Sequence, residues 1–172
     1  KAQAYIHAIA NEMRQRCHEL PSTLLSSVYV GGGTPSLLPH EAIRQLFGAI
    51  RTHFRISEGA EITFEANPDD ITSELLDVLI AVGVNRISLG IQSFNDQQLQ
   101  LLRRRHSATQ AIEAVRLIHR KGIPHISIDL IYGQPRQTLE AWQQDLTTAL
   151  SLPIDHLSAY ALSVEEATPL KR

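Results

Sequence analysis

The sequence predicts an α/β protein in which parallel strands form a partial (β/α) barrel. Short apolar runs rich in β-branched residues alternate with longer amphipathic segments, as in chains whose parallel strands are joined by crossover helices. Within the runs, apolar residues alternate with small polar ones, as in Ile126-Ser127-Ile128-Asp129-Leu130. A strand inside a doubly wound open sheet is covered by helices on both faces and is almost continuously apolar, so this alternation favours a barrel with a polar lumen. The five runs are too few to close an eight-stranded barrel.

Helical spacing and capping residues predict the segments between the strands. Apolar residues recur at helical spacing from Ala2 to Met13, and Cys17 follows near the end of that helix. Ser107 and Gln110 have the spacing of a capping box. In chain order, we expect the first three helices at 2–13, after Pro39, and at 75–80 with Gly83 just past the helix end. Three more are expected after Asn95, from Ser107 to Gly122, and over the apolar positions Leu139, Trp142, Leu146 and Leu150.

The five predicted strands lead into polar or glycine residues. They are expected at 28–30, 62–64, 87–91, 126–131 and 157–162. Ligand-binding groups of parallel α/β proteins gather at the carboxyl ends of the strands, where the βα loops meet. Candidate binding residues at these ends, and on the helix after the third strand in the case of Arg104, are Gly32, Gly33, Thr34, Glu65, Gln92, Arg104 and Asp129.

Bulk composition indicates one soluble globular domain. The chain has 172 residues, 43% of them hydrophobic, and a formal net charge of -2. Because no apolar run approaches ~18 residues and the N-terminus lacks a secretory signal, we expect a cytoplasmic protein without a membrane span. The near-neutral charge argues against nucleic-acid binding. A single cysteine, Cys17, excludes an internal disulfide framework and cannot form a thiolate metal site alone, so we predict no metal ligands in this chain. No Ser/His/Asp or Cys/His triad stands out in the sequence, so we predict no catalytic group either.

The turn Gly31-Gly32-Gly33-Thr34 indicates a bound polar group. Residues without a Cβ adopt positive φ readily and can bring backbone N–H groups against a ligand. The turn lacks the Lys-Ser/Thr ending of a P-loop and the spaced glycines of a dinucleotide fingerprint, so neither of these nucleotide-binding classes is supported. Taken alone, it is also compatible with an ordinary strand-to-helix connection.

Two carboxylates on the predicted lumen face limit the chemical classes of ligand that the site could bind. A buried carboxylate is costly unless it is paired or hydrogen-bonded, so Glu65 and Asp129 predict a cationic or hydroxyl-rich partner, such as an amino-acid-like molecule with a ribose. Arg104 could pair with a carboxylate of that ligand. Structural alternatives stay open: Glu65 as the edge of a turn, Asp129 in an internal ion pair, and Arg104 as a solvated cation in the run Arg103-Arg104-Arg105.

Five segments in order resemble the radical S-adenosylmethionine enzymes of the oxygen-independent coproporphyrinogen III oxidase family. The segments are VYVGGGTPSLL, FEANPDD, ISLGIQSFND, HISIDLIYGQP and HLSAYALSVEEATPL. Where the oxidases tend to have an acidic-Pro segment and a Gln-Asp pair, this chain has Glu65-Ala66-Asn67-Pro68 and Gln92-Ser93. The chain is therefore more similar to the heme-chaperone branch of the family.

This resemblance implies a partial (β/α)6 barrel that binds S-adenosylmethionine and a [4Fe-4S] cluster, with a tetrapyrrole such as heme as partner of the full-length protein. It places Gly32, Gly33, Thr34 and Glu65 at the methionyl end of S-adenosylmethionine, and it assigns further contacts with the same cofactor to Gln92, Arg104 and Asp129.

The family's cluster-binding sequence, C-x-x-x-C-x-x-C, does not occur in this chain. We therefore expect residues 1–172 to be the core of one radical S-adenosylmethionine domain, with the first strand, the cluster ligands and a C-terminal domain outside it, and to perform no radical chemistry alone. Three functions stay open: heme delivery, oxidative decarboxylation of coproporphyrinogen, and a cluster-free metabolic enzyme on the same scaffold.

Overall fold

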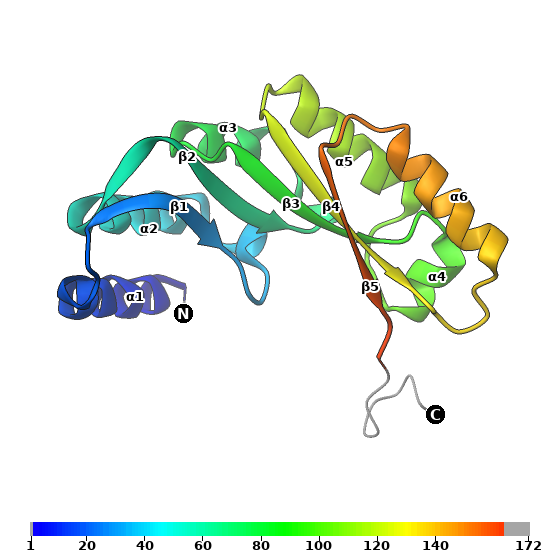
Figure 1. The fold of residues 1–172 in the computed structure, drawn as a ribbon, viewed down its shortest axis with the longest axis horizontal. Coiled ribbons are helices and arrows are strands. Elements are labelled where there is room, and N and C mark those ends of the chain that lie inside the picture. The colour runs from blue at the N-terminus through cyan, green and yellow to red at the C-terminus, as the bar shows by residue number, and fades with distance from the viewer. Residues whose placement is uncertain (1, 164–172) are drawn as a thin grey trace.

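The computed structural model describes residues 2–163 and confirms the partial barrel of parallel strands. Five strands lie in one sheet in the order of the chain, and every neighbouring pair is parallel. Figure 1 shows them fanned into a curved sheet. The strands are β1 (Leu24–Val30), β2 (Arg55–Ala66), β3 (Arg86–Gln92), β4 (His125–Tyr132) and β5 (His156–Ala161).

Helices connect consecutive strands, as expected for parallel neighbours. They are α1 (Ala2–Arg16), α2 (His40–His53), α3 (Ser73–Ala81), α4 (Asp96–Leu101), α5 (Ala108–Arg120) and α6 (Leu139–Leu150), with short 3-10 turns at Cys17–Glu19, Pro35–Leu37 and Pro68–Asp70. The capping box is confirmed, because the Ser107 side chain accepts from the Gln110 N–H and the Gln110 side chain accepts from the Ser107 N–H. Within residues 2–163, no helix has both the length and the apolar character needed to cross a membrane.

One face of the sheet carries the hydrophobic core. Side chains of alternate strand residues, among them Phe64, Leu89 and Ile128, have no exposed surface and pack with Phe47 of α2 and Leu76 of α3. The residues between them on each strand point the other way, which is the alternation that the sequence predicts. Within residues 2–163, no helix covers the second face, which carries the small polar side chains.

The second strand is much longer than the three residues predicted. Its first part pairs with Leu24 and Leu25 of β1, and the register then shifts between Leu25 and Ser27. Gly59 lies inside the strand at a φ of +74°. A glycine and charged residues interrupt the period-two pattern there, and only pairing with β1 makes the segment a strand.

Two predicted helix faces differ in the structure. In α6, Leu139 and Leu150 are 65% and 76% exposed, whereas Asp145 is 2% exposed. In α1, Tyr5 is exposed and Ile6 is the buried residue. Both helices lie toward the margins of the sheet, where a narrower stripe of each is covered, so apolar periodicity alone overestimates the buried face.

Candidate functional site

The carboxyl ends of the strands surround a cavity of about 190 Å3. Every residue predicted for the site except Gly32 lines it, namely Gly33, Thr34, Glu65, Gln92, Arg104 and Asp129. Strand register brings these residues together from distant parts of the chain: Glu65 lies opposite Ser88, and Asp129 lies opposite Ser158. The cavity thus lies on the polar face of the sheet.

The glycine turn after β1 has the conformation that the sequence predicts. Gly32 and Gly33 have φ values of +80° and +54°. At Gly31 the reason for glycine is close packing, because a Cβ atom there would lie 2.7 Å from Cδ of Glu65. Gly32 does not line the cavity itself, but its N–H donates to Oε2 of Glu65 at 3.0 Å. The turn therefore holds a carboxylate of the chain as well as forming one wall of the cavity.

Glu65 is held at both carboxylate oxygens. Besides the bond from Gly32, its Oε1 accepts a hydrogen bond of 2.6 Å from the hydroxyl of Tyr29. We did not identify Tyr29 from the sequence as a site residue. Its position in β1 could have indicated that role: Tyr29 lies between the apolar residues Val28 and Val30, so its side chain points to the polar face, where it lies opposite Thr63.

Asp129 lies in the middle of β4 and is half-buried. The Ser88 hydroxyl donates to its Oδ2 at 3.5 Å. Burial raises the pKa of Asp129, and the charge of Glu65 raises it further, whereas the hydroxyls of Ser158 and Ser88 lower it. The two carboxylates therefore interact across the cavity, and a cation between them would stabilise both.

Gln92 ends β3 in a strained conformation. Its φ is +74° and its side chain is buried. A Cβ atom at Gly90 would lie 2.9 Å from Nε2 of Gln92, so the glycine leaves room for the amide to fold back toward the cavity. Gln134 donates to the Gln92 carbonyl at 3.5 Å.

The structure corrects the position of Arg104 and separates it from its neighbours. Arg104 lies in the turn between α4 and α5, not on a helix, because Arg103 adopts a φ of +53° and ends α4 early. Arg105 pairs with Asp69 and Asp70 at 2.7 and 3.2 Å. In contrast, no carboxylate among residues 2–163 lies within 4.0 Å of Arg104, and burial lowers its pKa. Arg104 lines the cavity and Arg103 and Arg105 do not, so Arg104 is the arginine of this run that can meet an anion there.

Buried polar residues outside the cavity hold its loops. Asp145 of α6 accepts from the Ser93 hydroxyl and the Phe94 N–H, both at 2.8 Å, directly after Gln92. His106 is buried in the turn before α5, with Nε2 2.9 Å from the Ile91 carbonyl oxygen. The sequence contained no clear sign of Asp145, because a carboxylate on a helix usually faces water.

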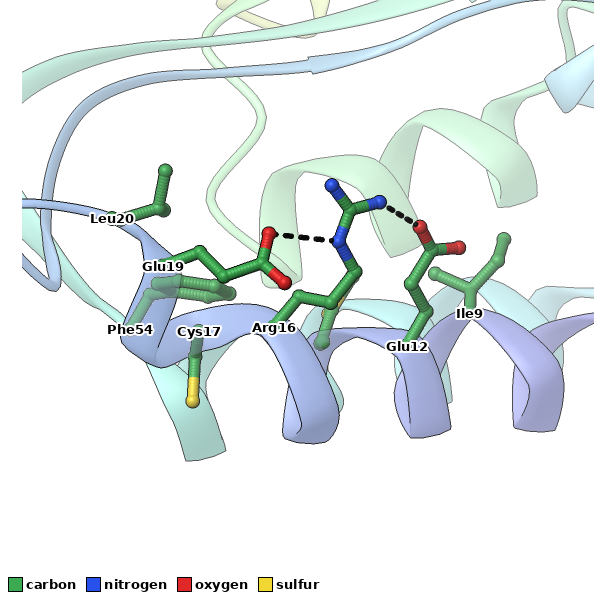
Figure 2. Close-up of a pocket in the computed structure, with 8 residues that line it drawn as sticks. Ile9, Glu12, Arg16, Cys17, Glu19, Leu20 and Phe54 are labelled. Carbon is green, nitrogen blue, oxygen red and sulfur yellow. Dashed lines mark hydrogen bonds and ion pairs between the residues drawn. The ribbon is translucent and has the colours of Figure 1, made fainter.

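Cys17 lies in a separate hollow of about 260 Å3 (Figure 2). This hollow shares no lining residue with the strand-end cavity, and Arg16 crosses it with hydrogen bonds to Glu12 and Glu19 at 2.8 and 3.1 Å. Within the described part of the chain, no three His, Cys, Asp or Glu side chains are grouped so as to hold a metal ion. The Cys17 thiol donates to the carbonyl oxygen of Arg14, with a sulfur-to-oxygen distance of 3.7 Å.

The strand ends of this half-barrel bring two carboxylates, one arginine and the glycine turn around a single cavity. The family model described as the Radical SAM superfamily matches residues 5–149. The chain therefore belongs to the radical SAM superfamily.

Individual relatives confirm the resemblance to coproporphyrinogen oxidases and heme chaperones. Heme chaperone HemW of Haemophilus influenzae is 38% identical over 170 residues, which cover 96% of this chain and 44% of that protein. HemW of Escherichia coli is 35% identical over 164 residues, covering 95% and 43%. The structure of coproporphyrinogen III oxidase HemN of Escherichia coli, described as a radical SAM enzyme, superposes with a TM-score of 0.86 at 32% identity, covering 94% of this chain and 37% of that one. The chain thus spans less than half the length of these relatives.

Proposed function

We propose that this chain is the S-adenosylmethionine-binding core of a radical SAM protein of the heme-chaperone type. One observation carries the first half of the proposal: two half-buried carboxylates and an arginine without a carboxylate partner among residues 2–163 line one cavity. The second half is supported by relatives that are named heme chaperones and are 35% and 38% identical over most of the chain.

S-adenosylmethionine fits this set of donors and acceptors. Its amino-acid end carries an ammonium group that complements Glu65 and a carboxylate that complements Arg104, and its ribose hydroxyls can donate to Asp129. We assign Gly32, Gly33 and Thr34 to the methionyl end and Gln92 to a further contact. The cavity of about 190 Å3 is smaller than the ~300 Å3 at the low end of enclosed ligand sites, so these residues form one wall of the proposed site.

The residues of the chain would bind and orient the cofactor, and the cofactor would supply the radical chemistry. Arg104 can bind a carboxylate through two parallel hydrogen bonds, which fixes the amino-acid end in one orientation. Glu65 and Asp129, on neighbouring parts of the polar face, would then set the direction of the ligand along the strand ends. Each of these contacts is charge-assisted and therefore stronger than a neutral hydrogen bond.

The described residues do not fit a [4Fe-4S] cluster. Such a cluster needs several thiolates, and the sequence has one cysteine, which lies in another hollow. We therefore propose that residues 1–172 form the core of one domain and that the cluster ligands, and the groups that bind heme, lie outside this chain. The last predicted motif, HLSAYALSVEEATPL, runs from 156 to 170, and its part after residue 163 lies outside the described residues.

Reconstitution of the full-length protein tests the proposal. S-adenosylmethionine binding by calorimetry, heme binding by absorbance titration, and conversion of coproporphyrinogen III are measured side by side. We expect the protein to bind S-adenosylmethionine and heme but not to convert coproporphyrinogen III. Conversion at enzymatic rates would instead support the oxidase, the alternative favoured by the similarity to HemN. The family match argues against the third possibility, a cluster-free metabolic enzyme.

A cytoplasmic location and the absence of nucleic-acid binding stay predictions of the sequence.

A further inference from the structure

Tyr29 contacts the candidate site through its hydroxyl and not through its ring. Within residues 2–163 the residue is 62% exposed, so its ring packs little against the core that these residues form. Its hydroxyl nevertheless turns toward the strand ends and donates to Oε1 of Glu65 at 2.6 Å, across a sequence separation of 36 residues. Burial of apolar surface does not explain this side chain, whereas the short hydrogen bond to a carboxylate does.

Three parts of the chain fix the Glu65 carboxylate in one orientation. Tyr29 donates to one oxygen, and the Gly32 N–H donates to the other at 3.0 Å. Gly31 supplies the space, because a Cβ atom there would lie 2.6 Å from Cε1 of Tyr29 and 2.7 Å from Cδ of Glu65. A glutamate side chain has three rotatable bonds, so holding both oxygens lowers the entropy that ligand binding must otherwise remove.

The phenol remains a donor over the physiological pH range. Burial of the hydroxyl, the hydrogen bond to Glu65 and the charges of Glu65 and Asp129 raise the pKa of Tyr29 to about 12. Each oxygen of Glu65 keeps a second lone pair after accepting one bond from the protein. The held carboxylate can therefore still accept from an ammonium group of a ligand.

We infer that Tyr29 is a positioning residue, which presents Glu65 to the ammonium group at the amino-acid end of the bound cofactor. The inference rests on the proposed function, since it takes S-adenosylmethionine as the ligand. It adds a residue outside the seven predicted from the sequence, and it assigns the ammonium contact to a preorganised pair and not to Glu65 alone.

Calorimetry with two ligands separates positioning from a general structural role. Full-length wild-type protein and the Tyr29→Phe variant are titrated with S-adenosylmethionine and with 5′-methylthioadenosine, which has the same nucleoside but no amino-acid end. Loss of one charge-assisted hydrogen bond should weaken S-adenosylmethionine binding roughly 10-fold and leave the second ligand within about 2-fold. Tyr132→Phe is the matched control, because that ring packs against Trp142 and its hydroxyl has no hydrogen bond within residues 2–163.

The possible outcomes are distinct. Unchanged S-adenosylmethionine affinity in Tyr29→Phe, or an equal loss for both ligands, would overturn the role of Tyr29 while leaving the proposed function intact. Failure of the wild-type protein to bind S-adenosylmethionine would overturn the proposed function and this inference together.

An absorbance measurement tests the Tyr29–Glu65 bond without any cofactor. With its pKa at about 12, Tyr29 should be about one-tenth ionised at pH 11, against about nine-tenths for an unperturbed phenol. The tyrosinate absorbance of wild type at pH 11 should therefore exceed that of Tyr29→Phe by only a small fraction of one tyrosinate. A difference close to one full tyrosinate would show that the hydroxyl is neither buried nor bonded to Glu65 as the structure has it, and would reject the inference.

Discussion

Glu65 and Asp129 show how single residues determine the character of this site. Both are acidic side chains of the polar sheet face, but their partners differ: Glu65 accepts from a tyrosine and a backbone N–H, and Asp129 accepts from serine hydroxyls. Serine hydroxyls only partly offset the effect of burial, and so the pKa of Asp129 is raised. An ionised Asp129 therefore costs stability in the ligand-free protein, and a ligand can recover that free energy on binding.

Asp129→Asn should increase the stability of the ligand-free protein and weaken S-adenosylmethionine binding. The folded-state pKa of Asp129 lies above its unfolded value, so wild type loses stability as pH rises through the folded pKa, and the asparagine variant does not. The free energies of unfolding of the two proteins, from urea titrations, should agree near pH 4 and diverge toward pH 7 in favour of the variant. Binding should fall roughly 10-fold or more.

Asp77→Asn serves as the control, because its side chain is 61% exposed and its ion pair with Lys121 is a surface contact. If Asp129→Asn were the less stable protein at pH 7, the raised pKa would not describe this carboxylate.

At the scale of elements, the loops after the strands are held by contacts that the strands themselves do not make. Asp145 of α6 reaches the turn after β3 and accepts two hydrogen bonds there. Ser36, in the turn after β1, donates to Asp70 in the turn after β2 at 2.7 Å, and Arg105 joins the same carboxylate. Loop positions therefore depend on one another, although each loop is short.

Asp145→Ala should destabilise the protein by about 1–3 kcal/mol, because it leaves the Ser93 hydroxyl and the Phe94 N–H without their acceptor in a buried site. Thermal or urea unfolding measures the change. Gln144→Ala, one residue earlier on the exposed face of α6, should change stability by less than about 0.5 kcal/mol. Equal effects of the two substitutions would argue against a stabilising role of the hydrogen bonds between Asp145 of α6 and the turn after β3.

Gly31→Ala tests the turn after β1. The added methyl group would lie within 3 Å of both Tyr29 and Glu65, and these side chains can shift away from it, so we expect cofactor affinity to fall about 10-fold with little change in stability. The control is Gly48→Ala in α2, where a Cβ atom meets nothing within 4 Å and alanine should stabilise the helix by about 0.5–1 kcal/mol. Normal cofactor binding by Gly31→Ala would contradict the need for a bare backbone at this position.

At the scale of the whole molecule, the two faces of the sheet have separate roles. One face packs against helices and supplies the core, and the other supplies the cavity. Because successive residues of a strand point to opposite faces, neighbouring positions should respond differently to substitution.

Ser88 and Leu89 are such neighbours. Ser88→Val places a larger apolar side chain in the cavity and should weaken S-adenosylmethionine binding while changing stability by less than about 1 kcal/mol. Leu89→Ser removes a side chain with no exposed surface and should lower the free energy of unfolding by about 3–5 kcal/mol. Binding titrations and urea unfolding of both variants check that Ser88 faces the cavity and Leu89 faces the core. If Ser88→Val mainly lowered stability and Leu89→Ser mainly weakened binding, these two positions would have been assigned to the wrong faces.

Sequence patterns are enough to predict the alternation of strands and helices, the apolar and polar faces of β2, β3 and β4, and the group of residues at the strand ends. These features follow from local periodicity, from glycine conformation and from the rule that parallel strands end at one edge. A predicted residue such as Asp129 was therefore found in the cavity without any knowledge of its neighbours.

Three features become clear only in the folded chain: the full length of β2, the exposure of Leu139 and Leu150, and the arginine that faces the cavity. The tertiary structure also revealed Tyr29 and Asp145, whose hydrogen-bond partners are 36 and 52 residues away. Register between strands and the placement of a turn depend on contacts between distant segments. Periodicity within one segment does not contain that information, which is why these features emerge only when the chain is folded.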